Sequence, residues 1–504
     1  MESFFLGTHQ LIGDPIALLL FGLALITGLV FGSVPGLSSM TLAAIFLPFS
    51  VFLSSEHAIL FYGVIYVSGV YGGATTAILF NIPGSVENTP TTFDGYPMAQ
   101  KGQAGRAVGL AITASAIGGT LSCIAMMVGT APIARWAISA ISPIEKFTII
   151  FFALAVVAGI GGGSFWKRWI SLFFGLWIGT IGTDPVGGLG RFAFGSYYVM
   201  TGINFTTLIV GFFAVSEVFV QGERLVRGTY KAPKVSVDFP GLSEFWRLKF
   251  AILRSSVIGF VCGVLPGIGA ALASFLSYSE AVRWSKHPER FGKGEPEGVV
   301  AAETANNAAT AGAMVPLLAL GMPGGGFTAI MIGVLTLHDL TPGPLVMIQH
   351  KTLVWILFSG MFWASIAILA LGLIETRLIV NLLRIPFSIL GPAIIFFSTI
   401  GAFSLRNNIL DVWTIFIAGI LGYVLRRYGY ALPAIVMGVI LGQIGEEAFY
   451  QSMVLMDYRL LGFFEYPTAA VFLVLGVATI IGNLVRMLRS RPTVPPSNRN
   501  VDGV

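Results

Sequence analysis

Two polar segments interrupt apolar stretches in the first hundred residues, and they hold the residues best suited to bind a solute. The first, Gly32–Thr41, contains the hydroxyls of Ser33 and Ser38 and the helix-breaking pair Pro35 and Gly36. A half-helix that begins after such a break directs its free N–H groups and its positive dipole end at whatever lies in front of it. This arrangement favours an anion.

The second polar segment, Tyr71–Thr92, is rich in side-chain amides and hydroxyls. These groups can hydrogen-bond carboxylate oxygens, and their oxygen atoms can coordinate a small cation. The candidate substrate or ion ligands in this segment are Asn81, Pro83, Gly84, Ser85 and Asn88.

Both broken segments recur in the second half of the chain. Gly263–Ile268 echoes Gly32–Leu37, and Met322–Gly324 echoes Ile82–Gly84. Two pairs in the same order are hard to attribute to chance, even with 62 Gly and 25 Pro residues. The second half carries an extra hydrophilic stretch, Arg283–Glu297, that accounts for its wider spacing. We therefore predict an internal repeat, which adds the candidates Pro266, Gly267, Pro323 and Gly324.

Glu303, Asn306 and Asn307 form a polar group in an otherwise apolar, alanine-rich run. An ionisable group at membrane depth costs at least about 2.5 kcal/mol, so Glu303 needs a reason to be there. It can pair with a transported cation or proton, or it can lie at the interface where water reaches it. The two asparagines can serve a site or hold helices together by hydrogen bonds.

The composition predicts an all-α integral membrane protein. Hydrophobic residues make up 55% of the 504 residues and charged residues only 11%, which excludes an ordinary soluble domain. A membrane span needs about 20 apolar residues, and the chain offers roughly eleven to fourteen such segments. Paired Pro/Gly breaks in two halves are typical of transporters with broken helices or re-entrant hairpins. The alternative is that they only kink ordinary spans.

The charged residues divide the chain and orient it. We predict a first membrane repeat at 1–220, a linker at 221–254, a second repeat with terminal helices at 255–489 and a tail at 490–504. Basic residues gather in the linker and near the C-terminus, so both are expected in the cytoplasm. With a periplasmic N-terminus, the first repeat crosses an odd number of times and the two repeats are inverted.

The sequence shows no pattern typical of an enzyme, a cofactor site or a nucleic-acid-binding protein. A phosphate-binding loop of the Walker type is missing, and the five histidines have no metal-ligand spacing. Cys123 and Cys262 lie in apolar runs without a CxxC pattern. We expect no cofactor and no structural metal; the metal ion to consider is a transported sodium ion.

Three stretches resemble the large membrane subunit of the tripartite tricarboxylate transporters: Gly32–Leu37, Tyr71–Ala99 and Glu303–Ala308. The resemblance spans about Leu11 to Arg489. It implies a bacterial inner-membrane permease that works with a small four-helix membrane subunit and a periplasmic solute-binding protein. It further implies sodium- or proton-coupled import of citrate or another carboxylate through sites in the paired breaks. A gradient-dissipating anion channel or a ligand sensor built on the same repeats is the alternative.

Overall fold

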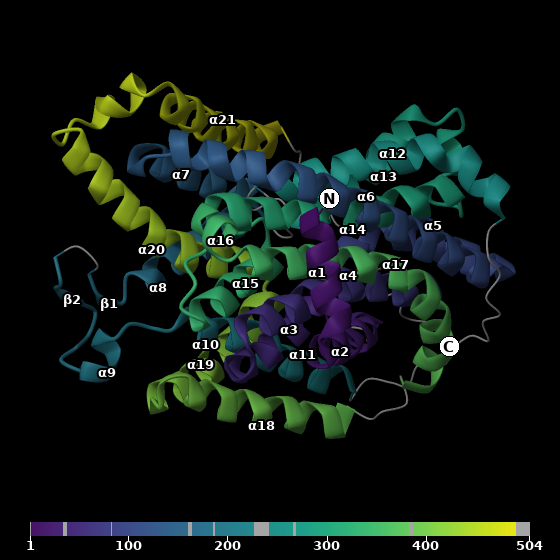
Figure 1. Ribbon diagram of the computed structural model, residues 1–504, viewed down its shortest axis with the longest axis horizontal. Helices are drawn as coiled ribbons and strands as arrows, with labels where there is room; N and C mark the ends of the chain where they lie inside the picture. The colour runs from purple at the N-terminus through teal and green to yellow at the C-terminus, as the bar shows by residue number, and fades with distance from the viewer. Residues whose placement is uncertain are drawn as a thin grey trace, which may run out of the picture.

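Apolar runs fold into helices that make up most of the described structure (Figure 1). The computed structural model describes residues 2–33, 38–81, 83–159, 164–184, 187–225, 241–265, 269–382 and 387–489. Within these ranges the strands are β1 (Gly182–Thr183) and β2 (Gly190–Arg191), which pair antiparallel.

The first half contains the following helices and short helical turns: α1 (Glu2–Gly13), α2 (Pro15–Ser33), α3 (Ser39–Phe46), η1 (Leu47–Phe52), α4 (Ser55–Phe80), η2 (Val86–Asn88), α5 (Thr89–Met98), η3 (Ala99–Gln103), α6 (Ala104–Ala140), α7 (Pro143–Gly159), α8 (Phe165–Gly179), α9 (Tyr197–Met200), α10 (Phe205–Ile209), η4 (Val210–Val215) and α11 (Ser216–Leu225). The second half contains α12 (Leu242–Val264), α13 (Gly269–Trp284), η5 (Pro288–Arg290), α14 (Pro296–Leu320), α15 (Gly326–Leu337), α16 (Pro344–Gln349), α17 (Lys351–Leu382), α18 (Phe387–Arg406), α19 (Ile409–Arg427), α20 (Leu432–Leu455), η6 (Leu460–Glu465) and α21 (Pro467–Arg489).

Seven helical stretches in the described ranges are long and apolar enough to cross a membrane. Four shorter apolar helices accompany them. This confirms the predicted all-α integral membrane fold. The seven stretches are Pro15–Ser33, Ser55–Leu79, Val86–Trp136, Lys351–Gly372, Ile409–Arg427, Leu432–Leu455 and Pro467–Val485.

Helix α14 is not one of these seven, although it has 25 residues. Glu303, Asn306 and Asn307 lower its hydropathy. Every residue from Gly298 to Ala319 is nevertheless buried. Protein therefore surrounds this helix on all sides, as its polar side chains require inside a membrane.

Helices α2 and α4 run parallel and begin at the same end of the molecule. His57 lies 2.7 Å from Asp14 at that end, and this hydrogen bond lowers the pKa of Asp14. Further along, a Cβ atom at Gly28 would lie 3.2 Å from the carbonyl O of Ile65. Because both helices advance together, α3 and η1 must return the chain to its starting end. These elements form a helical hairpin at the predicted break, and residues 34–37 lie outside the described residues.

Helices α12 and α14 repeat the α2–α4 pair contact for contact. A Cβ atom at Gly259 would overlap the carbonyl O of Ala305, and one at Gly263 would lie 2.5 Å from that of Ala309. The α12–α14 contacts follow from the α2–α4 contacts when 231 is added to each α2 residue number and 240 to each α4 residue number. The difference of nine residues is the extra loop length expected from the sequence. The internal repeat is therefore present in the packing itself.

The two repeats are inverted, because α4 and α14 run antiparallel. Asn307 Nδ2 donates to the carbonyl O of Val67 over 3.3 Å. Asn88 Nδ2 lies 3.1 Å from the carbonyl O of Val70 and 3.4 Å from Glu303 Oε1. Going forward along α4 from Val67 to Val70 therefore means going backward along α14 from Asn307 to Glu303.

Both central helices end in the same way. Asn81 (φ 57°, ψ 28°) follows α4 and Gly321 (φ 71°, ψ 23°) follows α14, and the two positions correspond in the repeat. Each is left-handed, and each N–H bonds a carbonyl five residues earlier. Asn and Gly are the residues that adopt this conformation most readily. The Pro-Gly pairs that follow are therefore breaks in the helix rather than kinks.

Each repeat lays the long helix that follows its second break, α6 or α17, against the central helix of the other repeat. A Cβ atom at Gly118 in α6 would overlap the carbonyl O of Thr304 in α14. The equivalent glycine in α17, Gly360, lies against Leu60 of α4. This exchange joins the repeats into one core.

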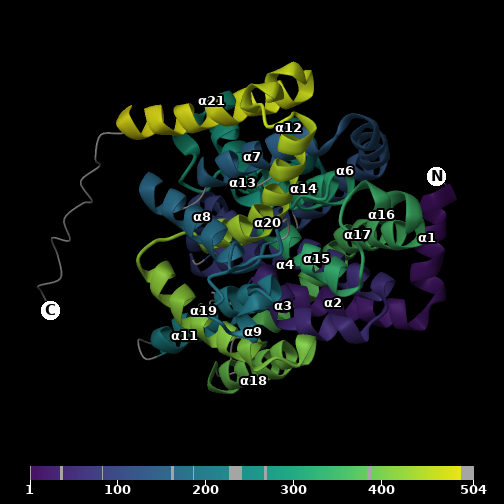
Figure 2. The same cartoon turned by 90° about the vertical axis from the view of Figure 1, so that its left-hand side faces the viewer.

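The remaining helices surround this core. Helices α21 and α18 lie at opposite edges in both views (Figures 1 and 2). The β1–β2 ladder and α9 lie at the left-hand end of Figure 1, whereas α5 lies toward the right-hand end. Helices α11 and α12 extend into the predicted linker from both sides, while 226–240 and 490–504 lie outside the described residues. The division into domains stays a prediction.

The glycine contacts between α12 and α14 predict a specific sensitivity. In Gly263→Ala the new methyl meets backbone atoms of Ala309 and Ala313 at 2.5 and 2.9 Å, which are hard to move. We expect a loss of about 1–3 kcal/mol and an apparent Tm lower by several degrees, measured by intrinsic fluorescence in detergent. Gly22→Ala in α2, which has nothing within 4 Å, is the control and should keep its Tm. Equal melting of the two variants would contradict the packing.

Candidate functional site

Glu303 lies at the centre of the molecule and is fully buried. Its Oε1 accepts hydrogen bonds from Thr91 Oγ1 and, over 3.4 Å, from Asn88 Nδ2. Its Oε2 accepts one from Ser115 Oγ over 3.1 Å. The donors come from η2, α5 and α6, so the first repeat supplies the surroundings of a carboxyl group in the second.

The partners of this carboxyl group are neutral. The sequence contains no Lys or Arg from 1 to 100 or from 294 to 350, the stretches that hold Glu303 and most of the broken segments. Glu87 on η2 is close enough to Glu303 to interact with it electrostatically. Burying a carboxylate without a cation is costly, and hydroxyl and amide donors offset only part of that cost. The site is therefore suited to take up a cation or a proton.

The repeat provides an internal control for this polar cluster. Glu303 corresponds to Gly63, and Thr91 corresponds to Met331. Ser115, placed by the matching glycines Gly118 and Gly360, corresponds to Leu357. The same helix crossing is thus built elsewhere in this chain from apolar residues. Packing does not require the carboxyl group, which points to a functional role.

Three helices begin close together near the breaks. Gly269, the first residue of α13, has φ +65°, and its Cα lies 3.4 Å from where a Cβ of Gly325 would be. Gly325 is the N-cap of α15, and Gly326 lies against Met40 in the first turn of α3. Three positive helix ends therefore lie close together. Such ends bind anions without a basic side chain.

Asn306 and Asn307 in the middle of α14 carry unsatisfied polar atoms. Both side chains are fully buried. Within the described residues, neither amide atom of Asn306 has a hydrogen-bond partner, nor has Oδ1 of Asn307. A buried unpaired amide costs about 1–3 kcal/mol. A bound ligand would remove that cost.

The structure sorts the predicted site residues into three groups. Asn88, Glu303, Asn306 and Asn307 lie in the core of the molecule. Ser33, Ser38, Asn81, Pro83, Gly84, Ser85, Pro323 and Gly324 shape the breaks, where Ser38 caps α3, Ser85 donates to Asn88 and Asn81 is exposed. Pro35, Gly36, Pro266 and Gly267 lie outside the described residues.

Sequence reasoning missed Thr91 and Ser115, which hold Glu303. It also missed Asp94, a fully buried carboxylate. The spacing of Asn88, Thr91 and Asp94 by three residues was the available signal, because it places all three on one side of a helix. Ser115 gave no signal, since only the tertiary packing brings α6 to α14.

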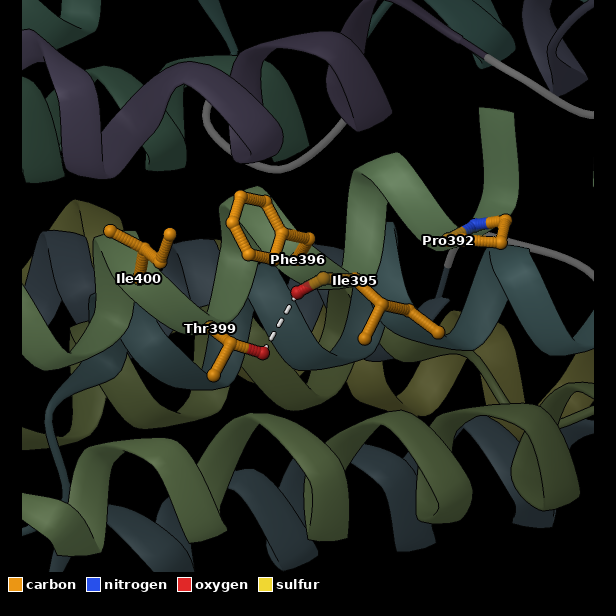
Figure 3. A pocket seen from close by; sticks show the side chains of 5 residues that line it. All are labelled: Pro392, Ile395, Phe396, Thr399 and Ile400. Atoms are coloured by element: carbon orange, nitrogen blue, oxygen red, sulfur yellow. Dashed lines mark hydrogen bonds between the residues drawn. The ribbon is translucent and has the colours of Figure 1, made fainter. Parts of the chain in front are cut away.

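A separate hollow of about 480 Å³ lies against α18 and is almost entirely apolar (Figure 3). Its one polar side chain, Thr399, donates to the carbonyl O of Ile395 within its own helix over 2.8 Å. It has no group that would recognise an anion or a cation. Its lining residues are Pro392, Ile395, Phe396, Thr399 and Ile400.

The donors to Glu303 can be tested singly. Thr91→Val keeps the shape of the side chain but removes one hydrogen bond, and we expect a loss of about 1–3 kcal/mol. The control is Thr113→Val, whose hydroxyl bonds only the carbonyl of Gly109 in its own helix. The readout is the apparent Tm of the purified protein. A Thr91 variant as stable as the Thr113 variant would argue against the hydrogen bond.

Comparison with known proteins identifies the family. The chain matches the sequence model of the tripartite tricarboxylate transporter TctA family over residues 18–437. An uncharacterized 52.8 kDa protein in the TAR-I ttuC' 3' region of Agrobacterium vitis is 34% identical over 477 residues, 95% of each chain. An uncharacterized protein in the TAR-II ttuC' 3' region of the same organism is 40% identical over 233 residues, 46% of this chain and 96% of that protein. No solved structure matches. With its inverted repeats and buried Glu303, the chain belongs to the tripartite tricarboxylate transporter TctA family.

Proposed function

We propose that this chain is the large permease subunit of a binding-protein-dependent secondary transporter. It imports citrate, another tricarboxylate or a related carboxylate, and a sodium or proton gradient drives it. A periplasmic solute-binding protein delivers the substrate, and a small four-helix membrane subunit completes the complex. Membership in the TctA family supports the partners and the substrate class.

The proposal rests on one observation: the two repeats together form two different polar environments. Converging helix ends suit the substrate carboxylate, and Glu303 with its neutral donors suits the coupling cation or proton. The stretches 1–100 and 294–350, which hold Glu303 and most of the breaks, contain no Lys or Arg to neutralise the anion. The substrate therefore gains from a cation or proton bound nearby, which is what symport requires.

Basic residues at one end of the molecule support an inner-membrane orientation. Lys101 Nζ donates to the carbonyl O of Lys293 over 2.6 Å, and Arg254 lies 3.4 Å from Glu297. Arg106 pairs with Glu244 close by. By the positive-inside rule this end faces the cytoplasm. The end carrying β1, β2 and α9 then faces the periplasm, where the binding protein would dock.

Uptake in proteoliposomes that hold all three proteins tests the function. We expect accumulation of radiolabelled carboxylate to require both the binding protein and an ion gradient. Glu303→Gln should reduce gradient-driven uptake by at least about tenfold, a loss of about 1.4 kcal/mol. Glu289→Gln, on the exposed η5 turn, is the control and should transport normally. Flux that needs no binding protein and only dissipates the gradient would indicate a channel instead.

Cysteine labelling of intact cells tests the orientation. The native Cys123 and Cys262 are both buried, so they contribute little background. A membrane-impermeant maleimide should label Phe194→Cys, at a position 93% exposed, from outside. Gln103→Cys at the basic end should react only after permeabilisation. The reverse pattern would invert the assignment.

A further inference from the structure

Asp94 is a buried carboxylate that joins the two repeats away from Glu303. Its Oδ1 accepts hydrogen bonds from the backbone N–H groups of Gly294 and Glu295, both over 2.8 Å. Its Oδ2 accepts one from Tyr278 Oη over 2.8 Å. The first repeat thus holds the loop that leads into α14. Unlike the side-chain donors to Glu303, two of these donors are backbone N–H groups directly before α14, where the helix dipole also favours a carboxylate.

The same side of η2 and α5 that carries Asp94 also carries the donors to Glu303. Asn88, Thr91 and Asp94 follow one another at three-residue intervals. A short helix moves as one piece, since its backbone hydrogen bonds resist bending. Any displacement of α5 therefore acts on Glu303 and on the Gly294–Glu295 backbone together.

Within the described residues, the second repeat has no equivalent of this connection. The repeat places Val334 of α15 where Asp94 stands in α5. Val334 is buried and has no polar group to hold a loop. The loop itself is the hydrophilic stretch that the second half has in excess, and it lies at the basic end. Packing of the fold does not demand the contact, since the equivalent position, Val334 in the second repeat, does without it.

We infer that Asp94 is a positioning residue that couples the Glu303 site to the loop before α14. The hydrogen bonds of Asp94 to Tyr278, Gly294 and Glu295 form a clamp. With this clamp formed, η2 and α5 hold Asn88 and Thr91 on the Glu303 carboxyl group, and the loop before α14 stays against α5. When the hydrogen bonds to Glu303 change, α5 moves and the clamp opens. The inference rests on the proposed role of Glu303 in ion coupling.

Hydrogen exchange of the full-length subunit in detergent tests the coupling directly, because the amides of Gly294 and Glu295 are themselves the donors. In Glu303→Gln one acceptor oxygen becomes an NH₂ group, so a donor loses its partner. We expect exchange in the peptide containing Gly294 and Glu295 to become faster by about fivefold or more. Peptides of α21, which do not contact this region, should not change.

Tyr278→Phe tests the opposite direction while keeping the aromatic ring. We expect it to raise the substrate concentration for half-maximal uptake at least about threefold, with an unchanged amount of protein in the membrane. Tyr458→Phe, at a position 65% exposed, is the matched control. A purely structural role for Tyr278 would change the amount of protein rather than this concentration.

Two results would overturn the clamp. Exchange at Gly294 and Glu295 within twofold of the wild type in Glu303→Gln would show that the loop does not sense the site. A loosened loop in Tyr278→Phe with unchanged uptake affinity would show that the clamp is only local. If instead Glu303→Gln transports normally, the proposed function itself fails, and the uptake assay distinguishes that case.

Discussion

The burial of one carboxyl group in a membrane determines much of this structure. Glu303 cannot face lipid, so α14 has to be enclosed by protein along its whole length, and it is. That enclosure places α14 at the centre, with α12 and α13 of its own repeat and α4, α5 and α6 of the other around it. A helix that is not apolar enough to be a candidate membrane span is thus the one that organises the rest.

Close helix packing in this core depends on small residues and not on large side chains. Lipid offers no hydrophobic driving force between helices, so contact has to come from close backbone approach. Gly28, Gly32 and Gly72 provide it in the first repeat, and Gly259, Gly263 and Gly312 in the second. Because both repeats use glycine contacts for packing, the other side chains can differ between them. Gly63 in the first repeat and Glu303 in the second occupy equivalent positions and show this difference.

Much of the architecture could be predicted from the sequence because its signals are local. Composition gives the membrane, the Pro-Gly pairs give the breaks, and their order gives the repeat. The Asn88–Glu303 contact could not be predicted, since 215 residues separate the partners and no local pattern links them. Asn81 was predicted as a ligand because of its side-chain amide. The structure instead uses its backbone, which adopts the left-handed conformation that ends α4. The sequence thus identified candidate site residues more readily than the residues that contact them.

The lack of Lys and Arg around the breaks also bears on how quickly a solute can leave. An arginine clamp would hold a carboxylate by paired, charge-assisted bonds and slow its dissociation. Helix ends and neutral amides hold it less tightly, which shortens its residence. A carrier has to release its solute on one side of the membrane as readily as it binds the solute on the other. In a system where a separate receptor collects the solute, the membrane subunit can favour turnover over retention.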